Sequence, residues 1–383
     1  MRSRLFLRPV LLLSAGLVAT ASLLLAKPRA RDLGVPFEGN PGPLNAITDV
    51  VGVTVGHTTI IRGEGKLTVG EGPVRTGVTA IFPRGRENPA PVFASWFSLN
   101  GNGEMTGTAW LDEAGVLDGP VALTNTHSVG VVRDAIIQWQ VRHPPRDGDI
   151  TWSLPVVGET WDGWLSDING FHVKPEHVFA ALEAAKSGPV AEGAVGGGTG
   201  MLCHEFKGGI GTASRISAGY TVGVLVQANY GLRAQLRIAG VPVGHEIPDG
   251  AIRSAVETGS LLVVIATDAP LLPHDLKRLA KRAALGLARN GGVSGNSSGD
   301  LFVAFATGNT VPTTPHQPGT VKILAPADLD PLFAAVVQAT EEAIVNALVA
   351  AETMTGRDGH TAIALPHDKL QAVLKKYGRL LEK

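Results

Sequence analysis

Two apolar segments in the C-terminal half constrain the fold of this chain more than any other feature. Residues 261–267 read LLVVIAT and residues 301–307 read LFVAFAT, and each segment follows a glycine and one small polar residue, Ser260 or Asp300. A strand with one face in water alternates apolar and polar residues, whereas a strand buried on both faces is apolar throughout. The near-repeat therefore predicts two central strands, in a layered fold with sheets in the middle and helices outside.

The rest of the chain supplies patterns for the other elements. Helical spacing of apolar residues predicts helices within 131–143, 176–188, 273–292 and 328–356, and the last is apolar enough to be mostly buried. Alternation, β-branched residues and glycine punctuation predict strands within 46–60, 75–83, 121–130 and 213–231, and residues 240–259 read as a loop. Because no break in composition divides the chain, these elements are expected to form a single domain.

Composition and cysteine count exclude several classes of protein. The chain is 44% hydrophobic and 17% charged, which is typical of a compact globular protein, and its net charge of −1 comes with scattered basic residues. No nucleic-acid partner is therefore expected. Cys203 is the only cysteine, so neither an intrachain disulfide nor a thiolate-rich zinc site can form. The histidines lack metalloprotease spacing, and the glycines of 195–200 fit no nucleotide loop, so no metal or cofactor is expected.

The N-terminus has the pattern of an export signal. Three arginines in the first nine residues precede an apolar run of 17 residues, 10–26, with small residues around it. We expect residues 1–30 to be a signal peptide cleaved after Ala21, Ala26 or Ala30, and a retained membrane anchor is the alternative. The mature protein is then periplasmic or secreted and has no contact with the membrane.

Gly259 and Ser260 admit two interpretations. A turn glycine before a strand is the ordinary one. Alternatively, if the chain is cut before Ser260, this serine gains an α-amino group with a pKa near 7.7–8.0, which can act as a base for its own hydroxyl. Glycine suits such a cut because it has no side chain to hinder attack on its carbonyl. The local sequence does not decide between the two.

Longer motifs point to a known family. The segments LTNTHSVGVVRDA, VVGETWDGWLSDING, GTGMLCHEFKGGIGTASR and GSLLVVIATDAPLLP together resemble the L-aminopeptidase/D-esterase and β-peptidyl aminopeptidase family, over about residues 45–366. The resemblance implies an α/β fold, a four-layer αββα sandwich. It also implies a precursor that cuts itself between Gly259 and Ser260. The single hydrolase domain would then consist of an α chain, residues 31–259, and a β chain, residues 260–383.

The resemblance also implies roles for six residues. Ser260 would be the nucleophile, with its own amine as base, and Ser298 would orient it. Asp300 would hold the freed amine, at the same edge as Ser260 on a neighbouring strand. The remaining roles are stabilisation of the oxyanion by Asn229 and binding of the substrate's ammonium group by Glu159. Trp161 stands where the family has a tyrosine, so it would contact substrate without a phenol's hydrogen bond.

The predicted function is a self-activated serine aminopeptidase. It would release N-terminal residues from short peptides, amides or esters with a free amino group, as a homo-oligomer, a tetramer or larger. One alternative is an acyltransferase of the ornithine acetyltransferase type, whose expected nucleophile is threonine, and another is a pantetheine-type amide hydrolase. A non-enzymatic binding protein is disfavoured because Ser260, Ser298, Asp300 and Asn229 are all present. The choice between α- and β-amino or D- and L-substrates stays open.

Overall fold

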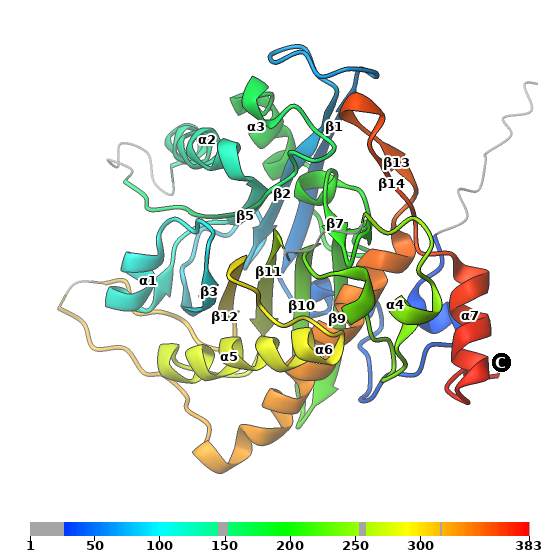
Figure 1. Cartoon of the computed structure of the whole chain (residues 1–383). Helices are drawn as coiled ribbons and strands as arrows, with labels where there is room; N and C mark the ends of the chain where they lie inside the picture. The colour runs from blue at the N-terminus through cyan, green and yellow to red at the C-terminus, as the bar shows by residue number, and fades with distance from the viewer. Residues whose placement is uncertain (1–26, 145–151, 253–257, 315, 383) are drawn as a thin grey trace, which may run out of the picture.

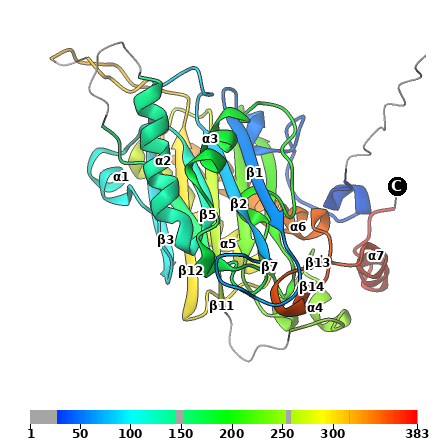
Figure 2. The same cartoon turned by 90° about the horizontal axis from the view of Figure 1, so that it is seen from above.

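The computed structural model describes residues 27–144, 152–252, 258–314 and 316–382, so most of the expected signal peptide lies outside it. Two sheets face each other (Figures 1 and 2), a four-stranded one in the order β1-β2-β5-β6 and a six-stranded one in the order β4-β3-β12-β11-β10-β9. The strands of the two sheets are β1 Thr54–Arg62, β2 Val74–Phe82, β3 Val92–Gly101, β4 Val116–Leu117, β5 Val121–Asn125, β6 Val156–Thr160, β9 Gly209–Ser217, β10 Tyr220–Asn229, β11 Thr258–Thr267 and β12 Ser297–Ala306.

Shorter elements complete the fold. Two small hairpins pair β7 Leu202–Cys203 with β8 Phe206–Lys207 and β13 Met354–Thr355 with β14 Thr361–Ala362. The α-helices are α1 Thr108–Ala114, α2 Val129–Arg142, α3 Pro175–Glu183, α4 Val243–Glu246, α5 Pro273–Arg289, α6 Asp330–Ala350 and α7 His367–Lys376. Single turns of 3₁₀ helix lie at Ala30–Leu33, Ile47–Asp49, Thr126–Ser128, Ile168–Gly170, Gly196–Gly198, Arg233–Gln235, Pro326–Asp328 and Arg357–Gly359.

The helices form the two outer layers of the predicted αββα sandwich. Helices α2 and α3 pack on the four-stranded sheet, and α5 and α6 pack on the six-stranded sheet at the opposite side of the molecule (Figure 1). In β11, Leu261, Val263 and Ile265 face α5 and α6, whereas the alternate residues Leu262, Val264 and Ala266 face the other sheet. The strand is apolar throughout because both of its faces are buried, as the sequence predicts.

Helix α6 is largely enclosed by the protein. Together with the 3₁₀ turn before it, Pro326–Ala350 has the length and hydropathy of a membrane span, but 83% of its most apolar window is buried inside the fold. It belongs to the core that covers the six-stranded sheet, which confirms the prediction of a mostly buried helix.

Strand direction places the ends of three strands together. Strands β11 and β12 are parallel and are joined by α5, and β10 runs antiparallel to β11. The N-terminal ends of β11 and β12 therefore lie beside the C-terminal end of β10. In Figure 1 these strands lie at the centre of the molecule.

The structure differs from the sequence-based elements in a few places. Residues 46–60 begin with a 3₁₀ turn, and the strand starts only at Thr54. The predicted strand 213–231 is a hairpin of β9 and β10 closed at Ala218–Gly219. The predicted loop 240–259 contains the short helix α4 and the first residues of β11, and its residues 253–257 lie outside the described part. The sequence did not predict β3, β6 or α7.

Candidate active site

Ser260 lies where β10, β11 and β12 meet. It is 6% exposed, and its Oγ donates a hydrogen bond to its neighbour's carbonyl, Gly259 O, at 2.8 Å and accepts one from Gly299 N at 3.2 Å. In the uncut chain Ser260 is the third residue of β11 and pairs with Asn229 of β10 on one side and Gly299 of β12 on the other. The hydroxyl is thus fixed beside the peptide bond that the sequence singles out.

Gly259 is required by close packing of two backbones. A β-carbon at this position would lie 2.3 Å from Asn229 O and 2.7 Å from Tyr230 Cα, which no side chain tolerates. The packing reason for glycine therefore adds to the chemical reason inferred from the sequence, an unhindered carbonyl.

Ser298 and Asp300 form a buried polar pair on the strand next to Ser260. Asp300 Oδ1 accepts hydrogen bonds from Ser298 Oγ at 2.9 Å and from Leu261 N at 3.0 Å. Among the described residues no group hydrogen-bonds its buried Oδ2, and burial raises the pKa of the carboxyl, opposed by the side chains of Ser294 and Ser298. The pair therefore presents one unsatisfied carboxylate oxygen to the interior.

The register of the two strands differs by one residue from the sequence comparison. The near-repeat aligns Ser260 with Asp300, but in the sheet Ser260 pairs with Gly299 and Asp300 pairs with Leu261. The offset is uniform along β11 and β12, and a separate bulge between Asp300 and Leu301 lies in the pairing of β12 with β3. Both residues still lie at the same edge, as predicted.

Asn229 presents a fully oriented amide. Its side chain is 5% exposed, its Oδ1 accepts from Leu202 N at 2.8 Å, and its Nδ2 donates to Trp161 O at 3.0 Å. Because directly opposed residues of an antiparallel pair share a face of the sheet, the Asn229 and Ser260 side chains lie on the same side. The amide has a second N–H available for a ligand.

Glu159 lies on β6, in the four-stranded sheet, and approaches the Ser260 region from the side opposite the six-stranded sheet. It is 3% exposed, and its carboxylate accepts hydrogen bonds from Glu104 N at 2.9 Å and from the Thr126 hydroxyl. A side chain on Gly103 would touch both Glu159 Oε1, at 3.4 Å, and Gly299 Cα, at 3.2 Å, so only a glycine separates Glu159 from the partner of Ser260. Burial raises the pKa of Glu159, opposed first by the hydrogen bond from Thr126.

The backbone and the side chain of Trp161 have different contacts. Its carbonyl accepts from Asn229, whereas the indole is 45% exposed and lies over Gly163, where a β-carbon would be 2.6 Å from the ring. The ring therefore stands at the surface beside the site, where it can contact a bound molecule.

Several groups at the site escaped the sequence reasoning. They are the Thr126 hydroxyl, the N–H groups of Glu104 and Leu202, and the glycine at 103, which all act on predicted site residues. Thr126 belongs to the motif LTNTHSVG, which offered a signal, but backbone donors leave none in a sequence. Within the described ranges there is no cluster of three His, Cys, Asp or Glu side chains that could hold a metal.

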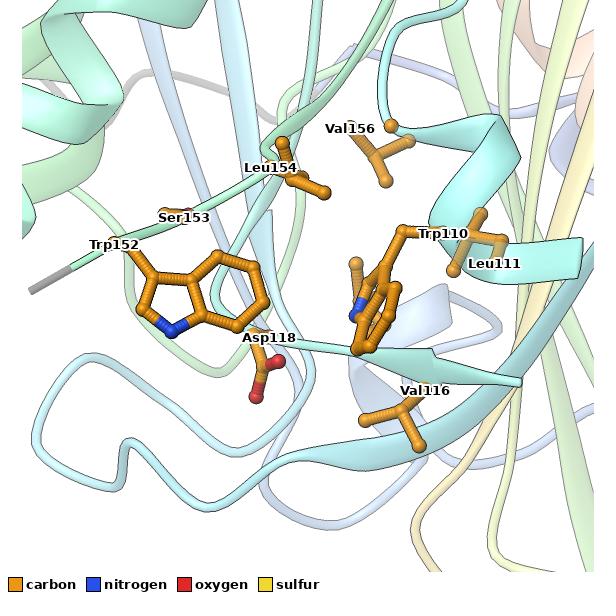
Figure 3. A pocket seen from close by; sticks show the side chains of 10 residues that line it. Trp110, Leu111, Val116, Asp118, Trp152, Ser153, Leu154 and Val156 are labelled. Atoms are coloured by element: carbon orange, nitrogen blue, oxygen red, sulfur yellow. The ribbon is translucent and has the colours of Figure 1, made fainter. Parts of the chain in front are cut away.

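A separate small pocket lies near the start of β6. It is lined by Trp110, Trp152, Leu154, Val116 and Asp118 among others, with the two indoles turned toward each other (Figure 3). Val156 lines it, and Glu159 is three residues further along the strand, about 10 Å away. The pocket is therefore distinct from the place where Ser260, Asn229, Asp300 and Glu159 converge.

Comparison with known proteins decides what this arrangement is. Residues 45–362 match the model of peptidase family S58. The chain belongs to this family. It is 54% identical to the β-peptidyl aminopeptidase BapA of Sphingosinicella microcystinivorans over 387 aligned positions, covering 96% of each chain.

Two solved structures of aminopeptidases share the fold. The L-aminopeptidase D-Ala-esterase/amidase of Ochrobactrum anthropi, described as a variant of the Ntn hydrolase fold, superposes with a TM-score of 0.87 at 50% identity, covering 92% of this chain and all of that one. A β-aminopeptidase of Burkholderia sp. gives 0.83 at 50% identity, covering 92% and 99%. This S58 chain is thus an N-terminal-serine aminopeptidase with an Ntn hydrolase fold, which confirms the family and enzyme class predicted from the sequence.

A buried carboxyl beside the S58 site should make the stability of the fold depend measurably on pH. Asp162 is fully buried, its Oδ2 accepts from Asn125 Nδ2 at 2.9 Å, and burial raises its pKa to about 7. A carboxyl whose pKa is higher in the folded than in the unfolded state stabilises the fold at low pH. This contribution is complete below about pH 4 and is lost as the pH rises to about 7.

We expect Asp162→Asn to remove this loss of stability with rising pH. The unfolding free energy of the variant minus that of wild type should increase by on the order of 2–3 kcal/mol from pH 5 to pH 8. Thermal or urea unfolding at both pH values measures the difference, with the exposed Asp328→Asn as control. A variant that tracks wild type at both pH values would show that Asp162 is ionised in the fold.

Proposed function

We propose that this aminopeptidase is made as a precursor that cuts its own chain between Gly259 and Ser260, and that Ser260 then acts as its N-terminal nucleophile. The supporting observation is the position of the Ser260 hydroxyl, held between Gly259 O and Gly299 N and directly opposite Asn229. In the cut protein the α-amine of Ser260 lies within reach of its own Oγ and can take the hydroxyl proton.

The neighbouring groups then acquire roles. The unsatisfied Oδ2 of Asp300 is available to accept a hydrogen bond from the freed amine, and Ser298 fixes the other carboxylate oxygen. Such a partner matters because a buried carboxylate without a compensating charge or hydrogen bond is costly. The free N–H of Asn229 would stabilise the oxyanion of the tetrahedral intermediate, a contribution worth roughly 10²–10³ in rate for one donor.

The catalytic cycle has two half-reactions. Ser260 Oγ attacks the substrate's acyl carbon while its proton passes to the α-amine, and the leaving amine takes that proton as the acyl–nitrogen bond breaks. Water then attacks the resulting ester and gives a proton to the α-amine of Ser260, which passes it to Oγ as the acyl–oxygen bond breaks. Glu159 would pair with the substrate's ammonium group, which supports selectivity for N-terminal residues.

We propose that the substrates are short peptides, amides and esters beginning with a small β-amino acid residue. The names of the Sphingosinicella and Burkholderia relatives support this preference, and the Ochrobactrum enzyme makes L-residues the comparison to run. Purified protein should release nitroaniline faster from β-alanine p-nitroanilide than from L-alanine p-nitroanilide. Release from the L-compound alone would contradict the preference, and acetyl transfer to ornithine without nitroaniline release would favour the acyltransferase alternative.

We further propose that the chain is exported and trimmed before Lys27 rather than after Ala30. Arg29 donates to both oxygens of the buried Glu192, at 2.7 and 3.1 Å, and Ala30 is fully buried with its N–H on Asn346. A cut after Ala30 would leave the Glu192 carboxylate without its cation. N-terminal sequencing of the exported protein tests this, and a start at Arg31 would contradict it.

We also propose that the protein is a homo-oligomer, which light scattering would measure.

A further inference from the structure

A fully buried lysine lies behind the site and takes no part in the chemistry described above. Lys207, at the end of β8, is 0% exposed, and its Nζ donates to three main-chain carbonyls: Met201 at 2.7 Å, Gly208 at 2.8 Å and Gly198 at 3.4 Å. Three acceptors match the three N–H groups of an ammonium. Burial lowers the pKa of Lys207 to about 7, so holding a cation here is costly.

The three carbonyls enclose the base of the β7–β8 hairpin. Met201 immediately precedes β7, Gly208 immediately follows β8, and Gly198 ends the 3₁₀ turn before them. Lys207 itself pairs with Leu202 across the hairpin, and Gly208 N donates to Met201 O at 2.8 Å. The ammonium therefore ties both strands of the hairpin to the preceding turn.

The tip of the same hairpin is held in a strained conformation. His204 and Glu205 have backbone φ angles of +48° and +60°, which residues other than glycine rarely adopt. Arg233 donates to both of their carbonyls, at 3.0 and 2.8 Å, and its guanidinium lies 3.2 Å from the ring centre of Phe206. Strain of this kind persists only where the surroundings impose it, so the hairpin is clamped at both ends.

The hairpin and the Trp161 carbonyl, which accepts from Asn229 Nδ2 at 3.0 Å, together hold the Asn229 amide in one orientation. Leu202 N–H, at the start of β7, donates to Asn229 Oδ1 at 2.8 Å. With its oxygen engaged there, the amide presents its Nδ2, the only end that can donate to an oxyanion. A rotated amide would present the oxygen and repel the developing negative charge.

We propose that Lys207 is a positioning residue for the oxyanion donor: its ammonium fixes the β7–β8 hairpin so that Leu202 N–H keeps Asn229 Nδ2 turned toward the reacting carbonyl. This inference rests on the proposed function, in which Asn229 stabilises the oxyanion. It assigns the buried cation to transition-state stabilisation through Asn229.

The test is a double-mutant cycle on nitroanilide hydrolysis. Lys207→Met should lower kcat by roughly 10–100-fold, a part of the 10²–10³ that a single oxyanion donor supplies, with KM unchanged within about threefold. Asn229→Ala should lower kcat by the full factor. Because Lys207 acts through Asn229, the double variant should be no slower than Asn229→Ala within about threefold.

Lys207→Gln and Arg29→Ala serve as controls. The glutamine retains two of the three donors and should have a kcat between those of wild type and Lys207→Met. Arg29→Ala loses a partly buried ion pair between the N-terminal segment and Glu192 and should lower the melting temperature with little change in kcat.

Three results would overturn the proposal: effects of Lys207→Met and Asn229→Ala that multiply, an unchanged kcat in Lys207→Met, or failure of both Lys207 variants to fold while Arg29→Ala folds. Absence of nitroaniline release by the wild-type protein would instead contradict the proposed function.

Discussion

The Ser260→Ala protein should remain one uncut chain and lose aminopeptidase activity by at least about 10⁴-fold, as expected on removing a catalytic nucleophile. The wild-type protein should instead give two co-purifying chains, the smaller one running from Ser260 to Lys383, 124 residues. The reason is that one hydroxyl serves both reactions: it is the group beside the Gly259 carbonyl in the precursor and the nucleophile afterwards. Intact mass and nitroanilide hydrolysis measure the two effects separately.

Ser297→Ala provides the matched control for this experiment. Ser297 begins β12 one residue before Ser298, and its contribution to the site is a backbone carbonyl that accepts from Asn102 Nδ2. This variant should be cut and active like the wild type. Cutting of Ser260→Ala, or an uncut but fully active wild type, would remove Ser260 from the mechanism.

Glu159→Gln should have the second largest effect, confined to substrates with an amino group. We expect kcat/KM for β-alanine p-nitrophenyl ester to fall by roughly 10²–10³-fold, the cost of burying a cation without its partner. Glutamine keeps an oxygen for the Glu104 N–H or the Thr126 hydroxyl, so the surrounding loops should stay in place. Hydrolysis of the propionyl ester, which lacks the amine, should change by less than about threefold.

The exposed neighbour Glu104 offers a variant with the same change of charge. Its backbone N–H donates to Glu159, and its charge raises the pKa of Glu159 less than burial does, so Glu104→Gln keeps the ammonium partner ionised and should leave both esters hydrolysed at nearly wild-type rates. Equal losses on the two esters in Glu159→Gln would indicate a structural role and contradict the assignment to ammonium binding.

The layered fold could be predicted from the sequence because burial on two faces leaves an unmistakable pattern. The apolar runs after Ser260 and Asp300 lie at the centre of the larger sheet. Strand β3 escaped prediction because one of its faces is partly open, so its burial follows neither pattern cleanly. Strand β6 is buried throughout but only five residues long, too short for a periodic signal.

The site was accessible from sequence only through family resemblance. Asn229 and Ser260 are 31 positions apart, and their contact depends on the β10–β11 register, which composition does not encode. The one-residue offset of Asp300 had the same origin, since it is a property of the whole β11–β12 register and leaves no mark on the local pattern. Lys207 was invisible for a different reason: all three of its acceptors are backbone carbonyls, which every residue carries.

Because of the strand order of the larger sheet, the proposed cut should make refolding of the protein much less efficient. Strands β11 and β12, from the smaller chain, lie between β10 and β3, from the larger one, so neither chain retains a complete sheet alone. Folding must therefore precede cutting. Once a cut molecule is denatured, its halves diffuse apart and must meet again as separate solutes at a concentration-dependent cost. How long the cut native state lasts then depends on its unfolding rate, and we expect less recovery after heating than for the Ser260→Ala protein, which can refold as a single chain.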